Sequence, residues 1–134
     1  EMSGHLFFAD RYFGYDDAVY ALLRLLEILA ASKQNLAEML SDLPPTFVTP
    51  EIRVPCPDEI KFKVVARVLE HYRATHPVAD VDGARVNFGD GWGLVRASNT
   101  QAVLVLRFEA SSEARRDAIR AEVEGVVREA RESP

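Results

Sequence analysis

An arginine and three short polar residues stand close together in this sequence: Arg96, Ser98, Asn99 and Thr100. They lie in a turn between two apolar runs, and the stretch 91–108 around them contains no Asp or Glu. No acidic neighbour in sequence therefore neutralises Arg96. A guanidinium can donate two parallel hydrogen bonds to an oxyanion, and hydroxyls, a carboxamide and the N–H groups of the turn can supply further donors. The pattern predicts a site that binds the phosphate of a small substrate.

The composition is that of an ordinary soluble globular chain. Its 134 residues are 48% hydrophobic and 28% charged, which is typical of that class and suggests about one domain by length. The net charge of −5 argues against nucleic acid as a partner, because nucleic-acid binding needs a basic face. No apolar run is long enough to span a bilayer, so we expect no membrane partner. The single cysteine, Cys56, excludes an internal disulfide and favours a reducing, cytoplasmic location.

The elements that position the polar turn are preceded by a group of helices. We expect Leu6–Phe8 to form a brief strand and Asp16 to cap a helix over residues 17–31. The apolar residues of this helix cover most of its circumference, so it should be buried on several sides. Because the sequence begins at Glu1 and not at a methionine, we expect a piece of a longer polypeptide that lacks part of this packing surface. A central core helix of one compact domain is the alternative.

A second, shorter helix is expected to follow, with Asn35 as its cap and Glu38 three residues later. The stretch Pro44–Pro50 contains three prolines, which should exclude a regular element there. The sequence therefore predicts a linker at residues 44–50 between residues 1–43 and residues 51–134.

After the linker, the predicted order is strand, helix, four strands and helix. The expected strands are 52–54, 78–81, 84–88, 93–97 and 103–109, and the expected helices are 58–72 and a last one that Ser111 or Ser112 caps and that ends near Arg131. Asp82-Gly83 between alternating segments predicts a two-residue hairpin. The residues expected to face inward are Phe62, Val65, Val68, Leu69 and Tyr72 in the first helix and Ile119, Val123, Val126 and Val127 in the last. The fold class is therefore α+β, an antiparallel sheet of about four to five strands with two helices on one face.

Two motifs of this sequence resemble the α-D-phosphohexomutase family. Glu1-Met2-Ser3-Gly4-His5 is similar to the sugar-binding loop of that family, and Arg96-Ala97-Ser98-Asn99-Thr100 is similar to its C-terminal phosphate-binding loop. The resemblance covers essentially the whole chain, and the first motif is most similar to the bacterial phosphomannomutase/phosphoglucomutase branch. Because the family has four domains, the resemblance implies that residues 1–43 end the third, sugar-binding α/β domain. Residues 51–134 would form the fourth, a small TBP-like phosphate-binding domain.

The resemblance also implies a reaction, the interconversion of hexose 1-phosphate and hexose 6-phosphate of glucose or mannose. In the family, a phosphoserine and Mg²⁺ act through a bisphosphate intermediate such as glucose 1,6-bisphosphate. The implied ligands in this chain are, for the phosphate that is not reacting, Arg96, Ser98, Asn99 and Thr100 and, for the sugar hydroxyls, Glu1 and Ser3, with His5 in the same loop.

The catalytic parts of the family are absent from this sequence, which has neither the serine loop nor the three-aspartate magnesium loop. Asp80-Val81-Asp82 resembles the latter only superficially and should be part of a hairpin. We therefore expect no catalytic residue and no metal ligand here, upstream domains of the same polypeptide as partners, and no activity of the chain alone. A non-catalytic phospho-ligand or protein-interaction module that has kept the fold is the rival interpretation. Without the resemblance, the polar turn would be ordinary turn chemistry and the first five residues a mobile terminus.

Overall fold

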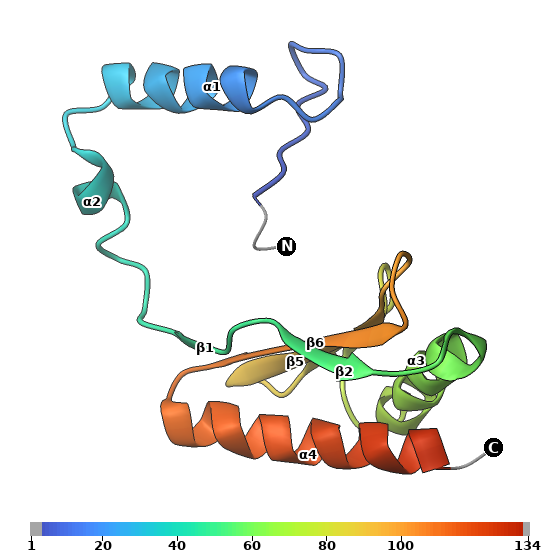
Figure 1. The fold of residues 1–134 in the computed structure, drawn as a ribbon. Coiled ribbons are helices and arrows are strands. Elements are labelled where there is room, and N and C mark those ends of the chain that lie inside the picture. Colours follow the sequence, from blue (N-terminus) through green and yellow to red (C-terminus); the bar gives the residue numbers. More distant parts are fainter. Residues whose placement is uncertain (1–3, 133–134) are drawn as a thin grey trace. The chain divides into compact units, whose positions relative to one another are not determined.

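The structure is a computed structural model that describes residues 4–132, and it forms two compact units, Glu1–Leu43 and Pro44–Pro134 (Figure 1). The first unit contains α1 (Ala18–Ala31) and α2 (Leu36–Met39). Among the described residues, no helix combines the length and the apolar character that crossing a membrane requires.

The caps of the two helices of the first unit follow from local hydrogen bonding. Asp17 caps α1, because its backbone is extended and its carboxylate accepts from the N–H of Tyr20 at 2.9 Å. The prediction of Asp16 as the cap is wrong by one residue. At α2, Asn35 and Glu38 form the predicted capping box, in which each side chain accepts from the backbone N–H of the other residue, at 3.1 and 2.8 Å.

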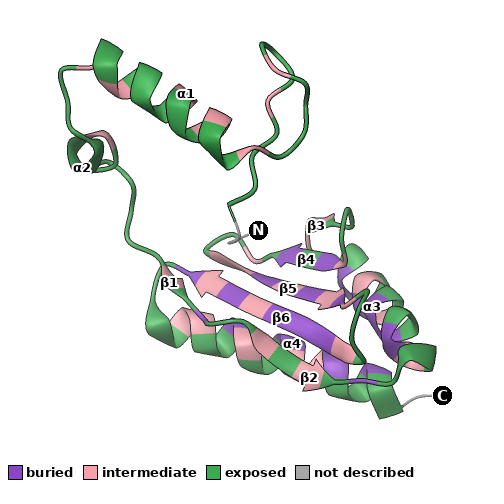
Figure 2. Cartoon of the chain, turned by 45° about the horizontal axis from the view of Figure 1, so that its top comes forward, coloured by how far each residue is buried: buried purple, intermediate pink, exposed green. Residues whose placement is uncertain are grey.

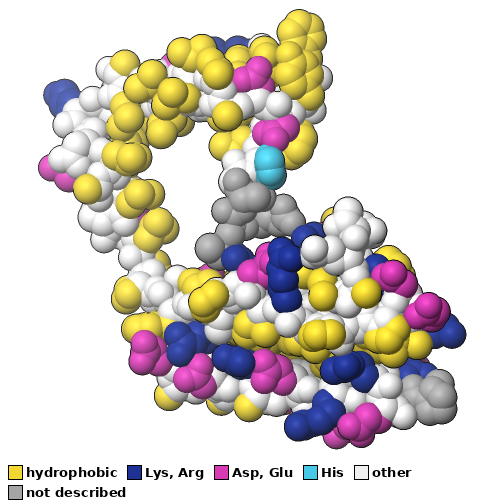
Figure 3. All heavy atoms as spheres, in the orientation of Figure 1, with side chains coloured by type: hydrophobic (Ala, Val, Ile, Leu, Met, Phe, Trp, Pro, Cys, Tyr) yellow, Lys and Arg dark blue, Asp and Glu magenta, His cyan; other side chains and the backbone are white. Residues whose placement is uncertain are grey.

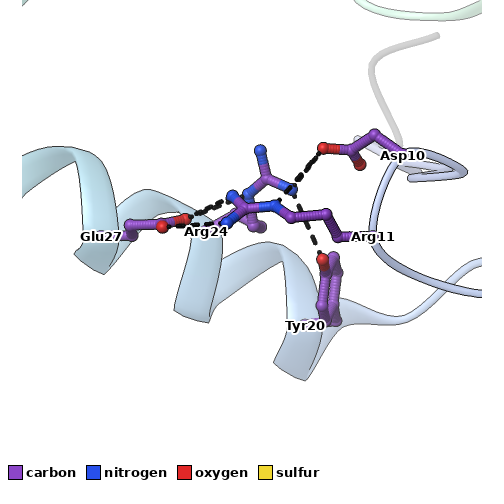
Figure 4. Close-up of polar contacts among 5 residues, drawn as sticks. All are labelled: Asp10, Arg11, Tyr20, Arg24 and Glu27. Atoms are coloured by element: carbon purple, nitrogen blue, oxygen red, sulfur yellow. Dashed lines mark hydrogen bonds and ion pairs between the residues drawn. The ribbon is translucent and has the colours of Figure 1, made fainter.

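A network of charged side chains ties the loop before α1 to the helix (Figure 4). Arg24 donates to Asp10 at 2.9 Å, and Arg11 donates to Glu27 at 2.9 Å. The hydrogen bond from Arg24 lowers the pKa of Asp10, and the hydrogen bond from Arg11 lowers the pKa of Glu27. All four side chains come from one short loop and one face of α1, so the network orders the loop locally.

Apolar side chains of the first unit are largely uncovered. No residue of α1 is buried, and yellow side chains gather along this helix in Figure 3. The large exposed apolar residues of α1 are Val19, Leu22, Leu23, Leu25, Leu26 and Ile28. The predicted strand at Leu6–Phe8 is wrong, because within the described residues Phe7 makes only a single bridge, to Asp16.

The second unit is built on an antiparallel sheet. Its elements are β1 (Phe47–Val48), β2 (Ile52–Pro55), α3 (Asp58–Arg73), β3 (Val78–Ala79), β4 (Ala84–Asn87), β5 (Gly91–Ala97), β6 (Val103–Ala110) and α4 (Glu113–Glu132). The strand order is β1-β6-β5-β4-β3, and β2 also pairs with β6. The predicted α+β class, with an antiparallel sheet and two helices, is confirmed.

The proline-rich stretch contributes a strand, although three prolines were expected to exclude one. Phe47 and Val48 pair with Ala110 and Glu109 at one end of β6. Thr49, which is buried, extends this pairing by two hydrogen bonds to Phe108. Its N–H donates to the carbonyl of Phe108, and its hydroxyl accepts from the N–H of Phe108. The prolines lie outside this two-residue strand, so no ladder hydrogen bond is lost.

Helices α3 and α4 cover one face of the sheet, and the striped burial of β5 and of the second half of β6 shows the alternation between the two faces (Figure 2). The core between sheet and helices contains Val64, Val65, Val68 and Tyr72 of α3, Ile119, Val123 and Val127 of α4, and Val86, Val95, Leu104, Leu106 and Phe108 of the sheet. The prediction that Phe62 faces inward is wrong, because this side chain is 57% exposed and Val64 takes its place in the core. The opposite face of the sheet carries no helix of the second unit, and we call it the open face.

The loop between β3 and β4 spans residues 80–83, two more than the predicted two-residue hairpin, because Ala79 pairs with Arg85. Gly83 has a φ of 92°, a conformation that favours glycine. A Cβ on Gly83 would also lie 2.7 Å from the Cβ of Arg96. The absence of a side chain therefore lets this loop press directly against β5.

Candidate phosphate-binding site

The predicted phosphate-binding residues come together at the end of β5. Arg96 occupies the open face one residue before β5 ends at Ala97, and the turn 98–102 leads into β6. Asn99 and Thr100 are exposed, and Ser98 is half-buried at the base of the turn. Strand alternation and the turn thus present one guanidinium and three short polar side chains within a few residues of one another, where solvent reaches them.

Ser98 organises the turn through its hydroxyl. Its Oγ accepts from the N–H of Thr100 at 3.3 Å and from the N–H of Gln101 at 3.2 Å. These two backbone donors, which the sequence suggested for the phosphate, are therefore engaged inside the turn. With its lone pairs occupied in this way, the Ser98 hydroxyl keeps its own proton to donate outward.

Arg96 has an acidic neighbour in space, although none lies beside it in the sequence. Its Nη1 donates to Oδ2 of Asp82, in the loop between β3 and β4, at 2.9 Å. The Arg96 side chain is 29% exposed and that of Asp82 is 61% exposed. An ion pair this exposed contributes about 0–1 kcal/mol, so the carboxylate does not close the site to a stronger anion.

Three side-chain and backbone contacts brace the turn from behind. Lys61 of α3 is only 4% exposed, and its ammonium donates to the carbonyl of Gln101 at 3.1 Å and to Asp58 at 2.6 Å. Arg53 of β2 donates to the side chain of Gln101 at 2.7 Å, and the N–H of Cys56 donates to the carbonyl of Ala102 at 2.9 Å. Nothing in the sequence indicates this role of Lys61, because a lysine in an amphipathic helix usually points to solvent.

Further arginines lie on the open face. Arg107 of β6 and Arg85 of β4 are both paired in register with Leu94 of β5, and the guanidinium of Arg85 lies 4.6 Å from the ring centroid of Trp92. Nη1 of Arg107 is buried without a hydrogen-bond partner in the described part of the chain. These two residues place further guanidinium groups on the same face of the sheet as Arg96.

A hollow of about 290 Å³ lies at the other end of β5. Trp92, Asp90 and Glu109 line it together with Pro44 and Pro45, and no lysine or arginine does. Asp90 is paired with Arg115 at 2.8 Å, and the lining itself offers no cation to a phosphate, so this hollow does not compete with the turn as a phosphate site.

The predicted sugar-binding residues lie in the first unit. Nδ1 of His5 contacts the carboxylate of Asp16, which ties the loop 4–8 to the start of α1. Glu1 and Ser3 lie outside the described residues.

Comparison with known proteins places the chain in a family. Residues 51–126 match the family model described as "Phosphoglucomutase/phosphomannomutase, C-terminal domain". The chain belongs to the phosphoglucomutase/phosphomannomutase family. Residues 1–47 match a second model, "Phosphoglucomutase/phosphomannomutase, alpha/beta/alpha domain III". The resemblance drawn from the two sequence motifs is thereby confirmed.

Individual members of the phosphoglucomutase/phosphomannomutase family are similar over most of this chain. A phosphomannomutase/phosphoglucomutase of Pseudomonas putida is 45% identical over 115 residues, which are 85% of this chain and 25% of that protein. A phosphoglucomutase of Neisseria meningitidis is 44% identical over 130 residues, 95% of this chain and 28% of that protein. The crystal structure of a phosphoglucomutase/phosphomannomutase family protein from Burkholderia thailandensis matches with a TM-score of 0.79 and 38% identity, over 99% of this chain and 28% of that one. The chain thus spans about a quarter of the length of these relatives.

The magnesium ion that the resemblance implies for the family does not fit the residues described here. Residues 4–132 contain no group of three or more His, Cys, Asp or Glu side chains that could hold a metal ion. The two aspartates that resemble a magnesium loop contact arginines, Asp80 with Arg73 at 2.6 Å and Asp82 with Arg96. They therefore serve the hairpin and the candidate phosphate site.

Proposed function

We propose that this chain is the C-terminal portion of a phosphomannomutase/phosphoglucomutase, an intramolecular phosphotransferase that interconverts hexose 1-phosphate and hexose 6-phosphate. Residues 1–43 would end the third domain, residues 44–50 would link the domains, and residues 51–134 would form the C-terminal phosphate-binding domain. The family matches and the quarter-length coverage of the relatives support this proposal. The uncovered apolar side chains of α1 support it as well, because the remainder of an α/β domain would bury them.

The observation that carries the proposal is the exposed turn after β5. Arg96 stands at its base, and Ser98, Asn99 and Thr100 present donors above it. A phosphate monoester has three terminal oxygens, which suit one guanidinium and several hydroxyl and amide donors. Contacts of this kind recognise the phosphate and not the sugar. The same turn can therefore hold the phosphate that is not reacting, whichever end of the hexose carries it.

The proposal assigns binding and orientation, not catalysis, to this chain. Glu1, Ser3 and His5 would contact sugar hydroxyls, and Asp16 would orient His5. The phosphoserine, Mg²⁺ and the 1,6-bisphosphate intermediate would belong to upstream domains of the same cytoplasmic polypeptide. The chain alone should therefore show no mutase activity.

A titration of the isotope-labelled chain with glucose 1-phosphate and glucose 6-phosphate, followed by amide chemical shifts, tests the proposal. We expect weak binding of both ligands, with similar affinity, and shifts of the backbone amides from Arg96 to Gln101. Arg96→Ala should weaken binding by about ten- to a hundredfold, since charge-assisted hydrogen bonds contribute about 1.5–3 kcal/mol each.

Arg85→Ala is the matched control for this experiment. It removes the same charge from the same face of the sheet, at a side chain that lies over the ring of Trp92. We expect it to change the affinity by less than about threefold, as screening of exposed charges predicts. Shifts elsewhere with a silent turn would contradict the proposal. A strong preference for one of the two sugar phosphates would favour the rival interpretation, a specialised non-catalytic module.

A further inference from the structure

Asp82 occupies the guanidinium that the phosphate would use. It contacts Nη1 of Arg96 through one carboxylate oxygen at 2.9 Å. A carboxylate and a phosphate offer the same kind of acceptor to a guanidinium, so they compete for the same donors. Asp82 also brings a negative charge to within a few ångströms of the place where a phosphate dianion would bind, which opposes binding.

The loop that carries Asp82 is held at both ends, by β5 at one end and by α3 at the other. Gly83 lies so close to Arg96 that a Cβ would not fit between them, and its positive φ sets the path of the chain there. Asp80, at the other end of the loop, pairs with Arg73 of α3 at 2.6 Å. The backbone of Asp82 therefore stays beside Arg96, while its side chain, 61% exposed, has solvent into which it can rotate.

We propose that Asp82 is a built-in competitor for the phosphate site, a residue that occupies Arg96 in the absence of ligand and releases it when a phosphate binds. The inference rests on the proposed function of the turn. It gives Asp82 the role of lowering the affinity for phosphate. A site that must hold either end of a sugar and then let it go gains from such a limit, because tight binding of the ligand slows its release.

The test compares Asp82→Asn with the unmodified chain in titrations with inorganic phosphate and with glucose 1-phosphate at low ionic strength. The substitution keeps the size of the side chain and removes its charge. We expect the dissociation constant to fall by about three- to fivefold, the range that an exposed ion pair of up to about 1 kcal/mol allows. The gain should shrink at about 0.5 M salt, where the Debye length is only a few ångströms.

Asp80→Asn is the matched control, because it makes the same change in the same loop at a carboxylate that pairs with Arg73. At the same ionic strength it should lower the dissociation constant by less than Asp82→Asn does, because it leaves the contact of Asp82 with Arg96 in place. In an Arg96→Ala background, Asp82→Asn should give a smaller gain, because there is no guanidinium to release and only the charge repulsion is removed.

The outcomes separate this inference from the proposed function. If Asp82→Asn binds phosphate no more tightly than Asp80→Asn, or more weakly than the unmodified chain, Asp82 is not a competitor. A loss would show that it positions Arg96. If Arg96→Ala binds glucose 1-phosphate as tightly as the unmodified chain, the phosphate site itself is wrong. Amide spectra that superimpose away from residues 80–83 and 96–101 establish that each variant is folded.

Discussion

Replacing Lys61 by methionine should loosen the turn that carries the candidate phosphate site. Lys61 is buried at 4% exposure, and its ammonium is the link from α3 to the carbonyl of Gln101, at 3.1 Å. Methionine keeps most of the apolar length of the side chain and its packing, and it removes the donor. The carbonyl of Gln101 then loses its charge-assisted hydrogen bond.

The magnitude follows from the exposure of the partners. A hydrogen bond to a charged group contributes about 1.5–3 kcal/mol. The side chain of Asp58, the second partner of Lys61, is 66% exposed, so water can replace the ammonium there with little loss in the free energy of unfolding. Relief from burying a charge offsets a further part of the effect. We expect a net loss of about 1–2 kcal/mol in the free energy of unfolding of the second unit.

Urea denaturation followed by the fluorescence of Trp92, the one tryptophan of the chain, measures this loss. Trp92 lies in β5, so its signal reports the second unit. With a urea dependence of about 1–1.5 kcal/mol per molar, the midpoint should fall by about 1 M. Lys63→Met is the control, because Lys63 is exposed on the same helix, and it should change the stability by less than about 0.5 kcal/mol.

The reasoning fails if the Lys61 and Lys63 variants unfold at the same urea concentration. It also fails if amide exchange at Thr100 and Gln101 is as slow in the Lys61 variant as in the unmodified chain. In that case, the contacts of Arg53 and Cys56 would be sufficient to hold the turn.

Two further predictions concern the hairpin loop and the core. Gly83→Ala should destabilise the second unit by about 1–3 kcal/mol and weaken phosphate binding, because its Cβ would collide with Arg96 and the backbone has a positive φ there. Urea unfolding and the glucose 1-phosphate titration measure the two effects. A variant that matches the unmodified chain in both measurements would contradict the prediction. Burial, and then the Glu122 carboxylate that its hydroxyl contacts at 3.3 Å, raise the pKa of Tyr72. The stability that its protonated form contributes is therefore complete below pH about 10, the unfolded value, and is lost as the pH rises above it. Urea unfolding at about pH 8 and about pH 11, on either side of the ordinary tyrosine pKa, measures this effect. The free energy of unfolding should fall less over this range in Tyr72→Phe than in the unmodified chain, and equal falls would contradict the assignment.

The sequence by itself determined the features that depend on local interactions. The capping box at Asn35 and Glu38 follows from residues three apart, whose backbone and side chains meet in the first turn of a helix. The polar turn follows from short polar side chains between two apolar strands. The α+β class follows from hairpins between alternating segments, because antiparallel neighbours need only short connections. The family followed from two motifs, and the family models confirm it.

Only the tertiary structure decided which distant residues meet. Asp82 lies beside Arg96 because Ala84 pairs with Val95, and that register is not visible in a stretch without acidic residues. Lys61 contacts Gln101, 40 positions later in the sequence, because the packing of α3 on the sheet places the first turn of the helix beside the turn that follows β5. Strand register and helix packing depend on the whole core at once. Local periodicity therefore indicated a sheet and a turn, while the electrostatic partners of the turn depended on the assembled fold.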